Sequence, residues 1–402
     1  MSTRKTTKRL QKTFPHGILN TNMKGGSTLI YLDYAASSPP YPQVAEKVQQ
    51  VMLEAYGNPG ALHLAGGQAR GILREARRTI ARLLNVREQE VFFTSGGTEA
   101  NNWAVKLGCR NGCRRHIVAA ATEHKSVLES IRQMLSQGYT VTYLHPGEDG
   151  RITPESVDAA LRPDTALLCV QAVNNETGVI QDVEALAAIA KRKGVRYFCD
   201  GVQSFGHVCQ SLHKADFTSI SAHKLGGPRG VGCLVARYPN LIPPLIHGGG
   251  QELGLRSGTE NLPGIAGFAL AARLSSEALR EEEIRLRNLT DALLGELKKA
   301  APSLEVNGQN SPRHPGILNC WFPGITGEEM VVRLDLKGIC ASPGAACSAM
   351  DPKPSHVLLA MGYPEQRAKE SVRFSIGRLT TMEEIEKTAR AVAEILKKGA
   401  FA

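Results

Sequence analysis

The chain has 402 residues, of which 42% are hydrophobic and 21% are charged, and its net charge is +10. The apolar share is large enough to bury a core, which excludes a disordered protein, and no window of eighteen residues is apolar enough to predict a membrane-spanning helix. Six positive charges lie in residues 1–32, which contain no acidic residue, so the rest of the chain carries only +4 and does not indicate a nucleic-acid-binding protein.

Residues 1–28 are predicted to form a basic, flexible N-terminal extension. Their serine, threonine and basic residues fit a transit peptide, but they contain no apolar segment of the kind found in secretory signals. A flexible start, or a true start at Met23, is the favoured interpretation. The predicted location is therefore the cytoplasm, or an organelle if the extension is a transit peptide.

Between residues 40 and 240, helical and strand patterns alternate along the chain. Helices are expected at 43–56, 67–84, from 98, from 125 and at 182–193, and strands at 91–95, 116–121, 140–144, 166–173 and 195–200. Because the strands are solidly apolar, the alternation predicts a mostly parallel sheet covered on both faces. Ligands of such sheets bind beyond the carboxyl ends of the strands.

A long helical pattern at 264–300 separates this region from the last hundred residues. These mix strands at 317–322 and 371–376 with helices at 327–336 and 381–398. The sequence therefore predicts an α/β protein with a large sheet domain over residues 29–280 and a smaller α+β domain over 281–402.

The nine cysteines are odd in number and irregularly spaced, and none forms a Cys-x-x-Cys motif. This pattern predicts no metal site, and without a secretory signal a reducing compartment without disulfides is expected. Most of them lie in apolar segments typical of a core. They are Cys109, Cys113, Cys169, Cys199, Cys209, Cys233, Cys320, Cys340 and Cys347.

Polar side chains follow several of the predicted strands. The glycine turn before Thr98 opens a helix, which would offer backbone N–H groups to an anion. Asp200 ends a buried strand and needs a cationic partner, and Lys224 ends another, where desolvation would favour a nucleophilic amine. His124 follows a third strand. Together these are the groups that pyridoxal phosphate (PLP) requires: a lysine, a carboxylate for the pyridine nitrogen, donors for the phosphate and a ring over the cofactor.

The chain resembles the NifS/IscS-type cysteine desulfurases, which belong to class V of the fold type I PLP enzymes. The resemblance extends from YLDYAASSPP at 31–40 to SVRFSIGRLTT at 371–381, so it covers nearly the whole chain beyond the extension. It is carried by the ordered motifs GNPGALH, FTSGGTEANN, TEHKSVL, VNNETGVIQD, DGVQSFG, SAHKLGGPRGVG, HGGGQELGLRSGTEN and SPGAACSAMDPKPSHVL.

The resemblance implies a role for each matching residue around the cofactor ring. Lys224 would bind PLP through a Schiff base, Asp200 would pair with the pyridinium nitrogen, and Gln203 would bond the ring hydroxyl. His124 would stack on the ring and transfer protons.

The resemblance also implies how the phosphate is held. Gly97, Thr98, Ser221 and His223 would bind it within one subunit. Thr259, in the RSGT motif, would reach the phosphate of the partner subunit, so a homodimer is implied.

For the substrate, the resemblance assigns Asn175, also a cofactor contact, and Arg373 to the carboxylate of L-cysteine. Cys347 lies in a stretch rich in small residues, serine and proline, which predicts an exposed loop suited to a nucleophilic thiol. Cys340, after an apolar run, is expected to be structural.

The implied activity removes sulfur from L-cysteine, giving L-alanine and a persulfide on Cys347. The persulfide would pass to an iron–sulfur scaffold protein or to a sulfur-relay acceptor for tRNA or cofactor thiolation. No resident metal is predicted, although a transient role of Cys347 as an iron–sulfur ligand with a scaffold is left open. Direct contact with nucleic acid or membrane is not predicted.

Three alternatives remain open from the sequence. A selenocysteine lyase or a class V aminotransferase would share the fold, and a transaminase would not need the thiol of Cys347. A non-catalytic subunit of iron–sulfur assembly would have no use for Lys224.

Overall fold

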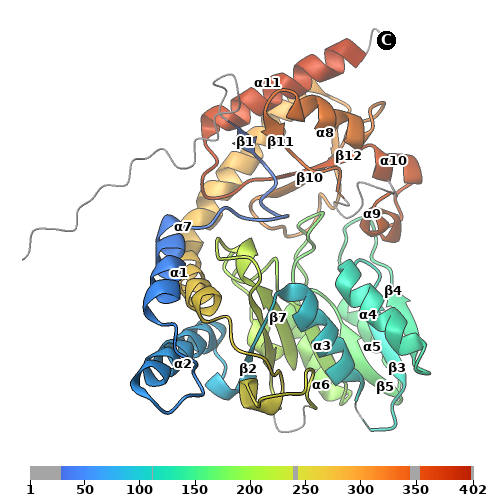
Figure 1. The fold of residues 1–402 in the computed structure, drawn as a ribbon. Helices are drawn as coiled ribbons and strands as arrows, with labels where there is room; N and C mark the ends of the chain where they lie inside the picture. The colour runs from blue at the N-terminus through green and yellow to red at the C-terminus, as the bar shows by residue number, and fades with distance from the viewer. Residues whose placement is uncertain (1–28, 111, 239–242, 345–353, 400–402) are drawn as a thin grey trace, which may run out of the picture.

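The structure is a computed structural model that describes residues 29–110, 112–238, 243–344 and 354–399 (Figure 1). The predicted extension at 1–28 and Cys347 lie outside these residues. Figure 1 shows a larger lobe built on a sheet, a second lobe above it, and the helix α7 running from one into the other.

The larger lobe is built on a mostly parallel sheet, as predicted, and this sheet has seven strands. Its strands lie in the order β2 (Val91–Thr94), β8 (Gly232–Ala236), β7 (Phe217–Ser221), β6 (Arg196–Asp200), β5 (Thr165–Cys169), β3 (His116–Ala120) and β4 (Thr140–Leu144). All run parallel except β8, which is antiparallel to both of its neighbours. The segment between β7 and β8 is too short for a crossover helix, so the chain returns antiparallel.

Helices cover both faces of this sheet. They are α1 (Pro42–Glu54), α2 (Leu64–Leu84), α3 (Gly97–Cys109), α4 (Lys125–Leu135), α5 (Pro154–Ala160) and α6 (Val183–Arg192). Alternate strand residues enter different cores: Val118 and Leu168 pack in one, and Ile117 and Leu167 in the other. This two-sided burial is the reason why the strands are solidly apolar.

The second lobe contains two small sheets. One has the order β12 (Ser371–Ser375), β10 (Ile317–Trp321) and β9 (Glu305–Val306), and the other pairs β1 (Ile30–Tyr31) with β11 (Ile339–Cys340). Its helices are α8 (Gly327–Asp335), α9 (His356–Ala360), α10 (Glu365–Lys369) and α11 (Met382–Gly399).

The start of the described chain belongs to the core of the second lobe. β1 pairs in parallel with β11, with Ile30 opposite Ile339, and Ile30 and Leu32 are buried in that core. The domain boundaries at residues 29 and 281 stay a prediction. The packing adds that the first strand lies with the last hundred residues, which no local pattern in the sequence indicates.

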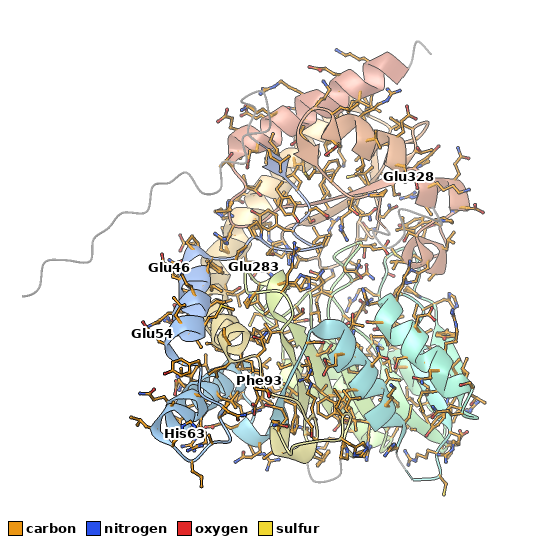
Figure 2. All side chains as sticks on the ribbon, in the orientation of Figure 1. Glu46, Glu54, His63, Phe93, Glu283 and Glu328 are labelled. Atoms are coloured by element: carbon orange, nitrogen blue, oxygen red, sulfur yellow. The ribbon has the colours of Figure 1, made fainter. Side chains whose placement is uncertain are left out.

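The helix α7 (Leu262–Ala300) joins the two lobes, because Phe268 is buried in the first core and Leu293 in the second. The helix α1 packs along it through Val44 and Val51, while Glu46 and Glu54 extend outward from α1 in Figure 2. No helix among the described residues is long and apolar enough to cross a membrane.

Candidate active site

A cavity of about 340 Å³ lies at the carboxyl ends of the parallel strands, where the two lobes meet. Ten of the predicted site residues line it: Gly97, Thr98, His124, Asn175, Asp200, Gln203, Ser221, His223, Lys224 and Arg373. Thr259 is exposed and does not line the cavity, and Cys347 lies outside the described residues. Most of the predicted residues therefore lie together at the edge of the sheet that the rule for parallel sheets indicates, and their roles stay a prediction.

Lys224 ends a short turn of helix, η3 (Ala222–Lys224), directly after β7. Its Nζ donates to the backbone carbonyls of Ala35 and Ala36, at 3.0 Å for the latter. The Oγ of Ser38 donates to the carbonyl of Lys224 at 2.6 Å. The segment that leaves β1 in the second lobe therefore fixes both the amine and the backbone of this lysine.

Asp200 is buried at the last position of β6, and neutral donors hold its carboxylate. Asn101 Nδ2 donates to Oδ2 at 2.7 Å, and the backbone N–H of Val202 donates to Oδ1 at 2.9 Å. Each carboxylate oxygen has a further lone pair, so Asp200 can still accept a bond from a protonated ring nitrogen. Asn101 was missed from the sequence, although it lies in the FTSGGTEANN motif.

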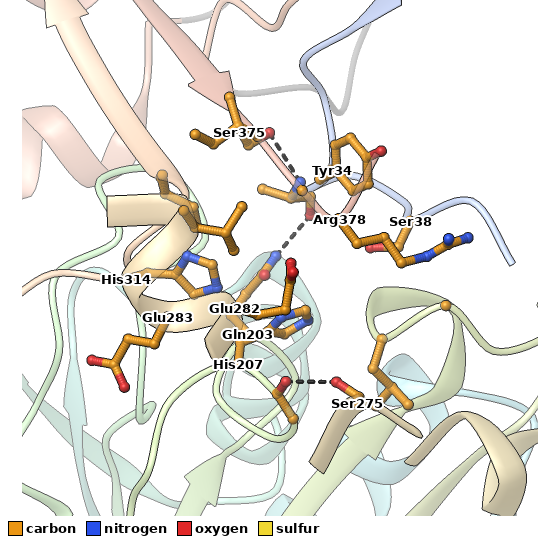
Figure 3. A pocket seen from close by; sticks show the side chains of 18 of the residues that line it. Tyr34, Ser38, Gln203, His207, Ser275, Glu282, Glu283, His314, Ser375 and Arg378 are labelled. Carbon is orange, nitrogen blue, oxygen red and sulfur yellow. Dashed lines mark hydrogen bonds between the residues drawn. The ribbon is translucent and has the colours of Figure 1, made fainter. Parts of the chain in front are cut away.

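Gln203 connects the cavity to a smaller one behind it, of about 50 Å³. Its Nε2 donates to the carbonyl of Ala35 at 2.7 Å, as Figure 3 shows. In the same view, His207 and His314 lie side by side, with ring centroids 5.2 Å apart. The carbonyl of Ala35 thus accepts from both Gln203 and Lys224, which couples these two side chains.

The N-terminus of α3 forms one end of the cavity. Its cap residue is Gly96, and no side chain caps the first N–H groups. A Cβ at Gly97 would lie 2.9 Å from the side chain of Val202, so a larger residue at this position would force Val202 to shift. The buried Oγ of Ser221 has no hydrogen-bond partner among the described residues. N–H groups without a side-chain cap and a buried hydroxyl without a partner are suited to bind a phosphate group.

His223 and His124 are held as neutral imidazoles. Burial, and then the charges of Lys224 and Arg229, lower the pKa of His223 to about 4. Burial is also the main reason why the pKa of His124 lies below its usual value. The Nδ1 of His124 accepts from the backbone N–H of Ser126 at 3.1 Å, so the neutral ring carries its proton on Nε2.

Arg373 is buried on β12, where it reaches the cavity from the second lobe. Its Nη2 pairs with Asp33 at 2.7 Å, and its Nη1 donates to the carbonyl of Asn175 at 2.8 Å. A guanidinium has five N–H donors, and the Nε–H has no partner among the described residues. N–H donors of Arg373 therefore remain for a substrate carboxylate. Asp33, which the sequence did not indicate, orients the guanidinium group.

Glu123 is buried directly behind His124. Its Oε1 accepts from the backbone N–H of Gln171 at 2.6 Å. Burial, and then the neighbouring Asp200, raise the pKa of Glu123 to about 8. The residue is therefore protonated at neutral pH, which avoids two adjacent buried carboxylates.

Glu123→Gln should stabilise the protein above pH 4.5. In the unfolded chain the carboxyl ionises near pH 4.5, whereas in the native protein it keeps its proton up to about pH 8, so native stability falls as pH rises through this window. Glutamine removes that loss, and we expect a melting temperature a few degrees higher at pH 8 and unchanged at pH 4. Calorimetry at both values checks this. The exposed Glu155→Gln should show no such trend, and an equal shift at both pH values would contradict it.

The loop that carries Thr259 is fixed at its base. Arg256 forms two bonds to Glu99 on α3, and Arg77 pairs with the buried Glu252 at 2.6 Å. The first contact ties the loop to α3, whose N-terminus forms one end of the cavity, and the second ties it to α2. Thr259 itself stays exposed.

Comparisons with known proteins agree with this geometry. The family model "Aminotransferase class-V" matches residues 30–388. Cysteine desulfurase IscS of Dictyoglomus turgidum is 38% identical over 376 residues, which cover 92% of this chain and 95% of that protein.

Two solved structures are similar over most of their length. A NifS-like protein has a TM-score of 0.85 and 34% identity, covering 92% of this chain and all of the other. The structure of SspA in complex with cysteine has a TM-score of 0.76 and 32% identity, and the match covers 88% of this chain and 100% of that chain. The chain, with its lysine, aspartate and arginine gathered at one strand-end cavity, belongs to the NifS/IscS-type cysteine desulfurases of the class-V aminotransferase family.

Proposed function

We propose that this enzyme binds PLP at Lys224 and transfers the sulfur of L-cysteine to Cys347, releasing L-alanine. The observation that carries the proposal is the meeting of Lys224, Asp200, the uncapped start of α3 and Arg373 at one cavity. A family relative solved in complex with cysteine supports the choice of substrate.

The residues of the cavity fit the cofactor at each end. Ser221 and the first N–H groups of α3 would hold the phosphate, Asp200 would keep the ring nitrogen protonated, and Lys224 would supply the covalent link. When bound, PLP supplies a ring that accepts electron density from the substrate's α-carbon.

Cavity residues then act on the substrate in defined ways. Arg373 binds the carboxylate and so sets which bond at the α-carbon lies nearest Lys224. The amine of Lys224 accepts the α-proton. The ring of His124, neutral and with its proton on Nε2, is a proton donor close to the reacting carbons.

Cys347 is the proposed sulfur acceptor. It lies outside the described residues, but the residues on either side of its segment are placed: Gly344 lines the cavity, and Ser355 directly precedes the cavity residue His356. The proposed onward acceptor is an iron–sulfur scaffold protein or a sulfur-relay protein.

A homodimer would complete the phosphate site, with Thr259 supplied by the partner subunit. Thr259 is exposed. So is a group of apolar side chains that includes Met52, Tyr56 and Leu62, and 99% of the surface of Leu62 is exposed. Such a concentration of exposed apolar residues supports burial against a second copy.

The proposed location is the cytoplasm. Every described cysteine is unpaired, which supports a reducing compartment.

Intact mass after brief exposure to L-cysteine without reductant tests the proposal. We expect one added sulfur on the peptide that contains Cys347, lost on reduction, together with released alanine. An aminotransferase would transfer the amino group of L-cysteine without adding sulfur to the enzyme. A selenocysteine lyase would barely react with L-cysteine. PLP-loaded protein that gains no sulfur would contradict the assignment.

A further inference from the structure

The backbone carbonyl of Lys224 contacts two polar side chains that do not line the large cavity. One is Ser38, whose Oγ donates to it at 2.6 Å, and the other is His207, whose Nε2 lies 3.0 Å away. His207 lines the smaller cavity of about 50 Å³ that Figure 3 shows. Because this ring is not part of the large cavity, it would act on the reaction through Lys224.

The contact with this carbonyl fixes the tautomer of His207. A carbonyl only accepts, so Nε2 carries the proton and donates to Lys224. Burial is the main reason why the pKa of His207 lies below its usual value, so the ring is neutral at pH 7. His207 therefore brings a donor to the backbone of the lysine without placing a second positive charge near its amine.

The turn that carries His207 is held by the helix α7. Gly206 has a φ of +79°, which residues with a side chain rarely adopt, and a Cβ there would lie 2.7 Å from the Oγ of Ser275. That Oγ donates to the carbonyl of Gly206 at 2.6 Å, as Figure 3 shows. The backbone N–H of His207 donates to the carbonyl of Ser204 at 3.0 Å. The backbone of His207 is therefore fixed on both sides of its peptide bond to Gly206.

A second histidine packs against this ring from the segment that leads into β10. The ring centroids of His207 and His314 are 5.2 Å apart, and the rings are tilted by 54°. His314 is buried, and its Nδ1 accepts from the backbone N–H of Gly316 at 3.0 Å, which fixes its ring. Its backbone N–H donates to the carbonyl of Gly178 at 2.8 Å. Lys224 is therefore held by two routes, one through Ser38 and the other through His207, whose ring His314 supports.

We propose that His207 is a positioning residue for Lys224, which fixes the backbone of the lysine so that its amine is held at the large cavity. This inference rests on the proposed function, in which that amine binds PLP and accepts the α-proton. The location of Nζ depends on the backbone from which the side chain extends, and a displacement of about 1 Å can cost roughly 100-fold in rate. Loss of one of the two donors should cost less, about tenfold.

His207→Leu and His207→Gln together form the test. Leucine has no donor, whereas the amide nitrogen of glutamine can take the place of Nε2 and donate to the same carbonyl. The first measurement uses no substrate: PLP is added to protein freed of PLP, and the visible absorption of lysine-bound PLP is followed with time. We expect this absorption to form about tenfold more slowly in His207→Leu, and within about twofold of the wild-type rate in His207→Gln.

The second measurement is alanine formation from L-cysteine. We expect kcat of His207→Leu to fall about tenfold while KM stays within about twofold, because the side chains that line the large cavity are unchanged. With α-deuterated L-cysteine, the isotope effect on kcat should be larger than in the wild type, because proton transfer to Lys224 is slower. His207→Gln should restore both values. His213→Leu, outside both cavities, is the matched control and should behave as the wild type.

A wild-type rate of PLP uptake in His207→Leu would overturn the role of His207. So would a His207→Gln protein that is as slow as His207→Leu, because the donor is then not what matters. A higher KM at constant kcat would also overturn it, since that result places the residue in substrate binding. If the melting temperature shows that His207→Leu does not fold, His207→Ala replaces it in each assay.

The two measurements separate this inference from the proposed function. PLP uptake needs no turnover, so it reports on Lys224 whatever the substrate of the enzyme is. Wild-type protein that takes up PLP but forms no alanine from L-cysteine fails the proposed function, while the uptake rates of the variants still decide the role of His207.

Discussion

Lys224→Ala should abolish turnover, with kcat lower by at least roughly 10⁴-fold, because we propose that the same amine holds the cofactor and accepts the α-proton. The loss should come with the disappearance of the visible absorption that lysine-bound PLP gives. Alanine formation and the absorption spectrum check both parts. The fold should survive, because Lys224 bonds to carbonyls at the cavity wall and not within a core.

Lys214→Ala is the control for this variant, since the exposed Lys214 ends the turn η2 (Leu212–Lys214) and does not line the cavity. It should retain wild-type activity and absorption. A Lys224→Ala protein that keeps both turnover and absorption would show that another amine holds the cofactor.

Cys347→Ala should remove persulfide formation and reduce alanine release from L-cysteine by at least roughly 10³-fold, because the sulfur then has no nucleophile to accept it. The exchange of the α-proton of L-alanine in deuterated buffer should continue at the wild-type rate, since that step uses Lys224 alone. Peptide mass mapping and proton NMR measure the two effects.

Cys209→Ala provides the matched control, because Cys209 is an exposed thiol outside the cavity. It should form the persulfide normally. Sulfur found on Cys340 in the Cys347→Ala protein would instead assign the nucleophile to strand β11. Undiminished alanine release would indicate a reaction that needs no thiol.

Most of the predicted residues that line the cavity share one property: each lies at the end of a strand of the large sheet or shortly after it. Asp200 and Lys224 could be located because the carboxyl ends of parallel strands meet at one edge, whatever the details of packing. The fold class followed from the same alternation of apolar strands and helices. Periodicity is a local signal, and these predictions needed only local signals.

The partners of those residues could not be found in this way. Asp33 meets Arg373 across 340 positions of sequence, and the carbonyls of Ala35 and Ala36 that hold Lys224 belong to residues with no distinctive side chain. The ring nitrogen of His124 that accepts the N–H of Ser126, and the ring nitrogen of His356 that lies 3.0 Å from the carbonyl of Glu123, are set by backbone atoms in the same way. Only the tertiary structure shows which ring nitrogen is occupied.

The pairing of β1 with β11 has a consequence for how the protein is made. Residues 91–236 contain all seven strands of the large sheet, so these strands are synthesised well before residue 339. Ile30 must wait for Ile339, and Asp33 for Arg373, so the first strand stays without its partner through most of synthesis. The substrate-binding arginine and the carbonyls that hold the lysine are therefore assembled last. A chain that ends before residue 339 would lack the partners of Ile30 and Asp33, so its cavity would be incomplete.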